Sequence, residues 1–202
     1  MFLPVENLNF ITKYSNDDNK SINLDKLGAS HWQKRKAETK NRIQETAKKL
    51  ISIAAKRSQT SAYKINFDPI EYEKFSSTFP FIETEDQLNA IDDIIEDFNK
   101  EIPADRLIVG DVAFGKTEVI IRAIYLAVKS NLQCIVLVPT TLLSRQHYQT
   151  FSKRFTPFGI NVFQLSRFIS KNDQLKIYDK IKDGNAQIII GTHGLLNDKI
   201  SF

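Results

Sequence analysis

The sequence has a single cysteine, Cys134, and no run of about 18 apolar residues. One thiol cannot form an internal disulfide, and its position in an apolar stretch indicates a small core residue. Without a long apolar run, no membrane-spanning helix is expected. Residues 1–6 lack the basic region followed by an apolar region that defines a secretory signal. These absences predict a soluble protein of the cytoplasm.

The chain has 202 residues, of which 42% are hydrophobic, enough to build a core in one large or two small domains. Its net charge of +4 is unevenly distributed. Residues 31–57 are mostly basic, residues 68–105 are mostly acidic, and residues 106–202 are again basic, which favours separate modules. The last block could attract a nucleic-acid backbone, although charge alone favours ordinary solvated lysines.

The most informative stretch follows the pattern Gly-x-x-x-x-Gly-Lys-Thr, which is typical of a phosphate-binding loop. An apolar run at 107–109 precedes it and an amphipathic helix pattern follows it, as such a loop requires. Glycines allow backbone N–H groups to approach phosphate oxygens, and the next helix adds the positive end of its dipole. A glycine-containing turn in an unrelated protein is the less favoured interpretation. The candidate ATP-binding residues here are Gly110, Asp111, Val112, Ala113, Phe114, Gly115, Lys116 and Thr117.

From residue 106 onward, apolar strands alternate with helices. This alternation predicts an α/β fold with a parallel sheet covered by helices on both faces. Before it, a basic helix is expected at 30–57, whose apolar stripe either contacts a partner or packs on its neighbour. The expected strands are 107–109, 133–138, 160–165 and 188–190, and the expected helices after the phosphate loop are 116–129, 142–155 and 172–183.

Hydroxyl and basic side chains follow three of these strands. In parallel sheets ligands bind at the carboxyl ends of the strands. Taken singly, each residue could be a local helix cap, but together beside a phosphate loop they favour a nucleic-acid groove. The candidate DNA-binding residues are Thr140, Thr141, Arg145, Ser166, Arg167, Thr192 and His193.

These motifs resemble the first motor domain of superfamily 2 helicases and translocases. Within that superfamily, residues 110–118, 137–143 and 190–193 are similar to the bacterial transcription-repair coupling factor family. Residues 3–8 resemble the end of that family's RNA-polymerase-interacting domain, and residues 27–32 resemble the linker that leads to its motor. The resemblance covers essentially the whole chain.

The resemblance implies an incomplete RecA-like sheet, ATP and Mg²⁺ as cofactors, and double-stranded DNA and RNA polymerase as partners. Phe81 and Gln87 match an adenine-recognition motif, in which the aromatic ring stacks on the base and the amide pairs with it. Lys116 would hold phosphates, and the Thr117 hydroxyl would ligate Mg²⁺. The residues at the strand ends match the family's DNA-backbone motifs.

Two departures from the family pattern affect these expectations. Ala113 stands where the family has glycine, which narrows the backbone's freedom if that position needs a positive φ. The sequence also contains neither the family's Asp-Glu-Glu-His motif nor its second motor domain with an arginine finger. The resemblance therefore implies a fragment of an ATP-dependent helicase or translocase, inactive as an ATP hydrolase alone.

The expected organisation has three parts. Residues 1–29 would be the remnant of a β domain that binds RNA polymerase, 30–67 a helical linker, and 68–202 the first part of the ATP-binding domain. The intact protein would translocate on double-stranded DNA and displace stalled RNA polymerase, coupling transcription to DNA repair. Two alternatives stay open, a fragment of a RecG-like branch-migration helicase and a non-catalytic nucleotide-binding or interaction module.

Overall fold

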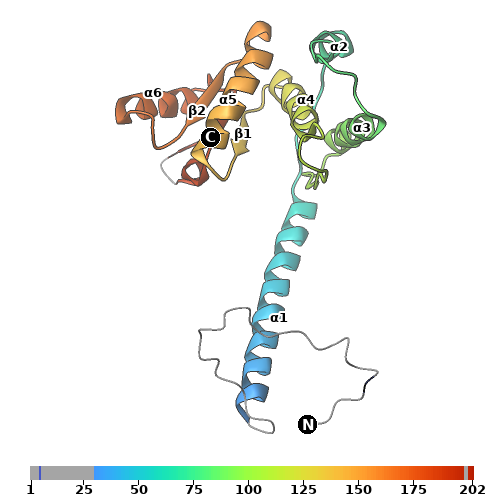
Figure 1. The fold of residues 1–202 in the computed structure, drawn as a ribbon, viewed down its shortest axis with the longest axis vertical. Helices are drawn as coiled ribbons and strands as arrows, with labels where there is room; N and C mark the ends of the chain where they lie inside the picture. Colours follow the sequence, from blue (N-terminus) through green and yellow to red (C-terminus); the bar gives the residue numbers. More distant parts are fainter. Residues whose placement is uncertain (1–4, 6–29, 198–199) are drawn as a thin grey trace. The chain divides into compact units, whose positions relative to one another are not determined.

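The computed structural model in Figure 1 describes residue 5, residues 30–197 and residues 200–202. The chain divides into two units, residues 1–54 and 55–202. Apart from Val5, the remnant expected at 1–29 lies outside the described residues, and the expected domain boundaries stay predictions. In the part of the chain that the structure describes, no helix is both long enough and apolar enough to cross a membrane.

Helices alternate with short strands in the second half of the chain, as the sequence predicts. The basic helix expected at 30–57 is confirmed as α1, and its apolar residues Ile43 and Leu50 are exposed. In chain order the elements are α1 (Ser30–Gln59), α2 (Pro69–Ser76), α3 (Glu85–Asn99), α4 (Lys116–Lys129), β1 (Cys134–Leu137), α5 (Thr141–Phe155), η2 (Thr156–Phe158), β2 (Val162–Leu165), α6 (Lys171–Lys182), β3 (Ile188–Gly191) and η3 (His193–Leu196).

The three strands form a parallel sheet in the order β1-β3-β2. Ile190 of the central strand is aligned with Val136 of β1 and with Gln164 of β2. Since the chain moves across the sheet from β1 to β2 and then back to β3, right-handed crossovers must put their two helices on opposite faces. The sheet is therefore covered on both sides, which confirms the predicted fold class.

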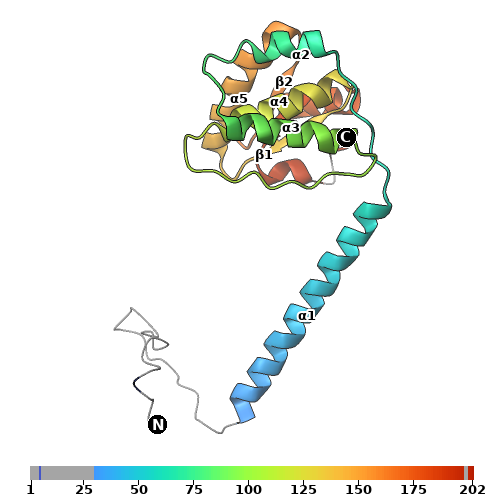
Figure 2. The ribbon, with the colours of Figure 1, turned by 90° about the vertical axis from the view of Figure 1, so that its right-hand side faces the viewer.

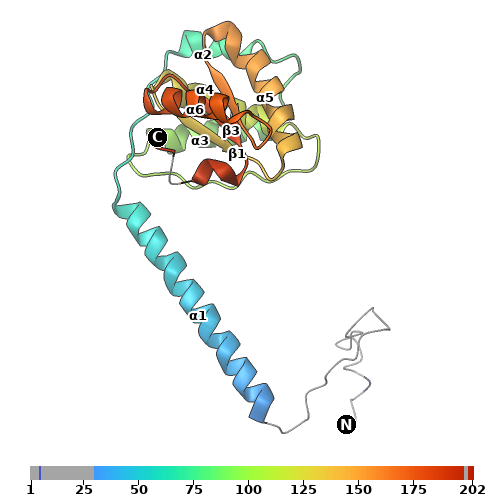
Figure 3. The same ribbon diagram turned by 90° about the vertical axis from the view of Figure 1, so that its left-hand side faces the viewer.

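Alternate residues of β3 point into two separate cores. Ile188 and Ile190 pack with α4 and with Phe151 of α5, while Ile189 packs with Ile181 of α6. Figure 2 looks onto the side where α4 and α3 lie in front of the strands, and Figure 3 looks onto the side of α6. All three isoleucines are fully buried, as expected for the central strand of a covered parallel sheet.

Cys134 of β1 packs against the first of these cores. Burial raises the pKa of its thiol to about 12, so the group stays protonated at neutral pH. This confirms that Cys134 is a small core residue rather than a reactive thiol.

The segments before α4 are fixed by local capping and by one aromatic stack. Asp68 caps α2, whose first residue is Pro69, a position where proline is well tolerated. Phe75 of α2 is fully buried and stacks on Tyr125 of α4, with ring centroids 3.9 Å apart. Thr84 begins α3 through a capping box with Gln87. The loop between α2 and α3 is thereby held beside α4.

The strand expected at 107–109 is wrong, because these residues are irregular in the structure. Leu107 and Val109 are 85% and 82% exposed, and the described residues offer no strand that pairs with them. A strand needs a hydrogen-bonded neighbour to be stable, so an apolar run without one does not form a strand. The segment still leads into the phosphate loop.

Candidate functional site

The phosphate-loop residues form an exposed turn directly before α4. Two of its residues, Ala113 and Gly115, have a positive φ, of 70° and 68° respectively. The turn is closed by a hydrogen bond from the Phe114 N–H to the Asp111 carbonyl oxygen, 3.3 Å long. Gly115 is the N-cap of α4, so the free N–H groups of that helix begin at the loop. Backbone N–H groups of this kind suit an anion.

Lys116 turns its side chain back onto the loop. Its Nζ donates hydrogen bonds to the carbonyl oxygens of Gly110 and Asp111, at 2.5 and 2.6 Å. Both acceptors are uncharged, so no carboxylate neutralises the ammonium group in these contacts. A phosphate entering the loop can take over these bonds, and charge-assisted bonds are the stronger kind. The loop geometry thus fits a phosphate.

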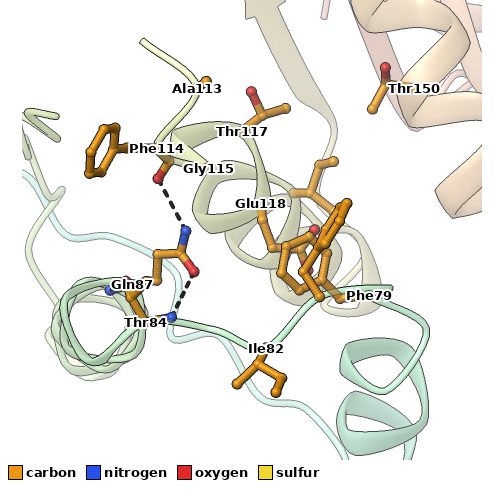
Figure 4. Close-up of a pocket in the computed structure, with 12 residues that line it drawn as sticks. Phe79, Ile82, Thr84, Gln87, Ala113, Phe114, Gly115, Thr117, Glu118 and Thr150 are labelled. Atoms are coloured by element: carbon orange, nitrogen blue, oxygen red, sulfur yellow. Dashed lines mark hydrogen bonds between the residues drawn. The ribbon is translucent and has the colours of Figure 1, made fainter. Parts of the chain in front are cut away.

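Gln87 joins the start of α3 to the phosphate loop. Its Oε1 accepts a hydrogen bond from the Thr84 N–H at 3.0 Å, and its Nε2 donates to the Phe114 carbonyl at 3.1 Å. Figure 4 shows both bonds. A Cβ added to Gly115 would lie 2.3 Å from the same Nε2, so glycine is needed there for the close approach as well as for φ. The pairing of Gln87 with adenine stays a prediction, since its amide is bonded within the protein here.

A hollow of about 490 Å³ opens between the phosphate loop and the loop that precedes α3. Phe79 and Phe81 contribute aromatic walls, with their rings 5.5 Å apart in an edge-to-face arrangement. Phe81 is 72% exposed, which leaves its ring free to stack on a planar group. Gln87, Gly115 and Thr117 line the opposite parts of the hollow (Figure 4). An aromatic pocket next to a phosphate loop fits a nucleotide.

Thr117 is the residue expected to ligate Mg²⁺, and its side chain lines this hollow. Among the residues that the structure describes, no group of three or more His, Cys, Asp or Glu forms a ready-made metal cage. Mg²⁺ typically takes one or two protein ligands and completes its shell with phosphate oxygens and water. The Thr117 hydroxyl beside the phosphate loop fits that mode, in which the metal neutralises phosphate charge.

Four charged side chains lie beside the hollow and were missed by reasoning from the sequence. Glu118 Oε1 accepts hydrogen bonds from Arg122 Nε at 2.9 Å and from Arg154 Nη2 at 2.7 Å. Arg122 Nη2 also donates to Glu83 Oε1. The sequence did carry a signal, because Glu118 and Arg122 stand four residues apart on the apolar face of a predicted helix. We call Glu83, Glu118, Arg122 and Arg154 the charged cluster.

The members of the charged cluster stay ionised at neutral pH. Burial by itself lowers the pKa of Arg122, but the hydrogen bonds from Glu118 and Glu83 outweigh it and the net shift is upward. A backbone hydrogen bond and the Arg122 guanidinium lower the pKa of Glu83. Arg122 and Glu118 are both about 5% exposed as side chains, so each needs the other as a partner.

The candidate DNA-binding residues come together at the carboxyl ends of the strands, in two adjoining hollows. Their acceptor and donor groups come from the segments after β1, β2 and β3. Thr140 also accepts a hydrogen bond from the Leu143 N–H at 3.2 Å, so local capping explains part of its role. A hollow of about 420 Å³ is lined by Pro139, Thr140, Thr141, Arg167, Thr192 and His193. A second, of about 400 Å³, is lined by Thr141, Leu142, Arg145, Gln164, Ser166, Phe168 and Ile169.

The chain matches the DEAD/DEAH box helicase family model over residues 84–201. Over its whole length it is 49% identical to the transcription-repair-coupling factor of Rickettsia conorii, 46% to that of Borreliella burgdorferi and 37% to that of Escherichia coli. The chain spans 18% of the length of each of these curated relatives.

A solved structure of RecG bound to a three-way DNA junction is also similar, with a TM-score of 0.70 and 30% sequence identity. That likeness covers 75% of this chain and 21% of RecG. The family model matches more than half of the chain, and the curated relatives bear out the resemblance read from the motifs. The chain therefore belongs to the DEAD/DEAH box helicase family, and its sequence relatives within that family are transcription-repair-coupling factors.

Proposed function

We propose that this chain is the ATP-binding part of a DNA-translocating motor of the transcription-repair-coupling type. The observation that carries the proposal is the joining of a phosphate loop to an aromatic hollow through Gln87. Lys116 and the backbone of the loop bind the phosphates, Phe81 stacks on the base, and Thr117 ligates Mg²⁺. When bound, the metal neutralises charge on the phosphate oxygens.

In the same proposal, double-stranded DNA lies along the carboxyl ends of the strands. Thr141, Arg145 and Arg167 line the two hollows there and offer one hydroxyl and two guanidinium groups for phosphodiester oxygens. Such contacts hold the backbone and carry no sequence information. The intact protein would use ATP hydrolysis to move on DNA and displace stalled RNA polymerase. A RecG-like motor is the second candidate, favoured by the fold likeness at 30% identity.

Nucleotide binding is tested by titrating the chain with Mg·ADP and Mg·ATP in a calorimeter. Lys116→Ala should weaken binding by at least about tenfold, since it removes a charge-assisted bond worth roughly 1.5–3 kcal/mol. Lys129→Ala is the matched control, because Lys129 stands at the other end of α4 and pairs with Glu71. We expect no ATP hydrolysis, since Thr117 alone gives no general base for water. Equal affinity of the two variants, or hydrolysis that depends on Lys116, would contradict the proposal.

DNA binding is tested with duplexes of unrelated sequence over a range of salt concentrations. Affinity should be indifferent to sequence and fall steeply with salt, because phosphate contacts release counterions. Arg145→Ala and Arg167→Ala should each reduce the slope of log affinity against log salt by about one. Lys176→Ala, which removes an exposed lysine paired with Asp173 on α6, serves as the control. A clear sequence preference, or affinity that does not change with salt, would count against this surface.

A further inference from the structure

The charged cluster holds the aromatic wall of the hollow at both ends. Arg154 of α5 donates from Nη1 to the Thr78 hydroxyl, just before Phe79. Arg122 of α4 donates to Glu83, just after the segment Phe79–Ile82. These four residues, which we call the aromatic segment, include both phenylalanines of the hollow.

Both arginines meet at one carboxylate, that of Glu118. This residue directly follows Thr117 of the phosphate loop, and its side chain also lines the hollow. Arg154 in addition lies over the rings of Phe75 and Phe79, with its guanidinium carbon 4.9 and 5.8 Å from their centroids. The aromatic segment, the first turn of α4 and the last turn of α5 are thus joined through a single buried acceptor.

Such a cluster has little freedom to rearrange. Charges with side chains only about 5% exposed, such as those of Glu118 and Arg122, are tolerated because each has a hydrogen-bonded partner. Any movement of the aromatic segment away from α4 would leave a buried guanidinium without its acceptor. Phe81 and Ile82, in contrast, are exposed and have few packing contacts that could fix them. The position of the aromatic segment therefore depends on the cluster more than on apolar packing.

We propose that Arg122 and Arg154, anchored on Glu118, are positioning residues that set the aromatic segment at the distance from the phosphate loop that a nucleobase requires. This inference rests on the proposed nucleotide-binding function. Neither arginine lines the hollow, so neither touches the nucleotide, and both act through Phe79 and Phe81. The cluster accordingly determines affinity for the base and leaves affinity for the phosphates to the loop.

The first test measures the aromatic segment itself, without nucleotide. Amide hydrogen exchange of peptides from residues 77–84 is compared between the wild-type chain and Arg154→Ala. We expect exchange in this segment to rise by at least about tenfold, while α4 and α5 keep their protection. Arg106→Ala is the control, because Arg106 also pairs with two carboxylates, those of Asp93 and Asp97, and does not contact the segment. Unchanged exchange in Arg154→Ala would overturn the inference.

A milder variant decides the question if Arg154→Ala does not fold. Thr78→Val removes the hydroxyl that accepts from Arg154 and keeps the shape of an exposed side chain. Glu83→Gln does the same at the other end of the segment by removing the charge that faces Arg122. Faster exchange in both variants supports the inference, and wild-type exchange in both overturns it.

The second test separates the base from the phosphates by comparing Mg·ADP with inorganic pyrophosphate. The same variants should lose about tenfold in affinity for ADP, in the range of one lost base-stacking contact, and less than about twofold for pyrophosphate. Lys116→Ala should weaken both ligands. An equal loss for ADP and pyrophosphate would show a general structural effect and overturn the inference. A wild-type chain that binds neither ligand would refute the proposed function, while the exchange result would still decide whether the cluster positions the segment.

Discussion

Ala113 is the residue at which the phosphate loop departs from its glycine-containing pattern. The sequence raised the question of whether this position needs a positive φ, and the structure gives it a φ of 70°. For a residue with a Cβ, the left-handed region costs roughly 1–2 kcal/mol. The loop therefore has a strained residue between Asp111 and Lys116, at the place where its backbone must face phosphate oxygens.

Replacing Ala113 with glycine should relieve this strain. The gain is partly offset by the greater freedom of glycine in the unfolded chain, so we expect Ala113→Gly to raise the free energy of unfolding by up to about 1 kcal/mol. Urea denaturation followed by circular dichroism measures the change. Asn131→Gly is the control at a φ of 61°, where asparagine is well tolerated and the gain should be smaller. A loss of stability on Ala113→Gly would show that the left-handed conformation is not strained.

At the scale of the elements, the motifs predicted more than the isolated apolar runs did. The helix after the phosphate loop and the capping of α5 by Thr140 could be predicted, because both depend on local chemistry. The strand at 107–109 could not, because a strand depends on a neighbour that sequence alone does not show. The charged cluster was missed for the same reason, since Arg154 lies 36 residues from Glu118 and only the fold brings them together.

The central strand β3 ends at a glycine that has no room for a side chain. A Cβ on Gly191 would lie 2.4 Å from the Leu165 carbonyl oxygen and 2.9 Å from two side-chain carbons of Leu195. Gly191 thus lets β2 and η3 approach β3 closely, at the edge where the candidate DNA-binding residues emerge. The arrangement of the two hollows depends on this approach.

Gly191→Ala should force β2 or η3 to shift, with a loss of about 1–3 kcal/mol in the free energy of unfolding, as overpacked sites typically show. Gly194→Ala is the matched control, because its new Cβ would have no atom within 4 Å and its φ is not positive. Thermal and urea denaturation of the two variants should differ clearly. Equal stability of both would mean that β2 and η3 adapt without cost.

At the scale of the unit formed by residues 55–202, the sheet has one open edge. β1 is paired on one side only, and its residues Ile135 and Leu137 are 40% and 47% exposed. Leu107 and Val109, in the segment where a strand was expected, are exposed as well. An unpaired apolar edge offers backbone groups to any other strand, including that of a second molecule.

The isolated chain should accordingly self-associate in a concentration-dependent way. Ile135→Lys places a charge on the open edge and should reduce this association, since edge lysines oppose strand pairing. Leu175→Lys is the control, because it exchanges an exposed apolar residue of α6 for the same charge away from the edge. Sedimentation velocity distinguishes the two variants. A wild-type chain that stays monomeric at high concentration, or an equal effect of both lysines, would contradict the prediction.

The hydrogen bonds between Lys116 and its own loop make phosphate binding an exchange rather than an addition. An entering phosphate replaces the carbonyl oxygens of Gly110 and Asp111, so the ammonium group keeps its number of bonds. The gain comes from charge, because a bond to an anionic oxygen is about twice as strong as one to a neutral oxygen. A nucleoside carries no anion to exchange, so the loop by itself selects for the phosphates and leaves the choice of base to the aromatic hollow.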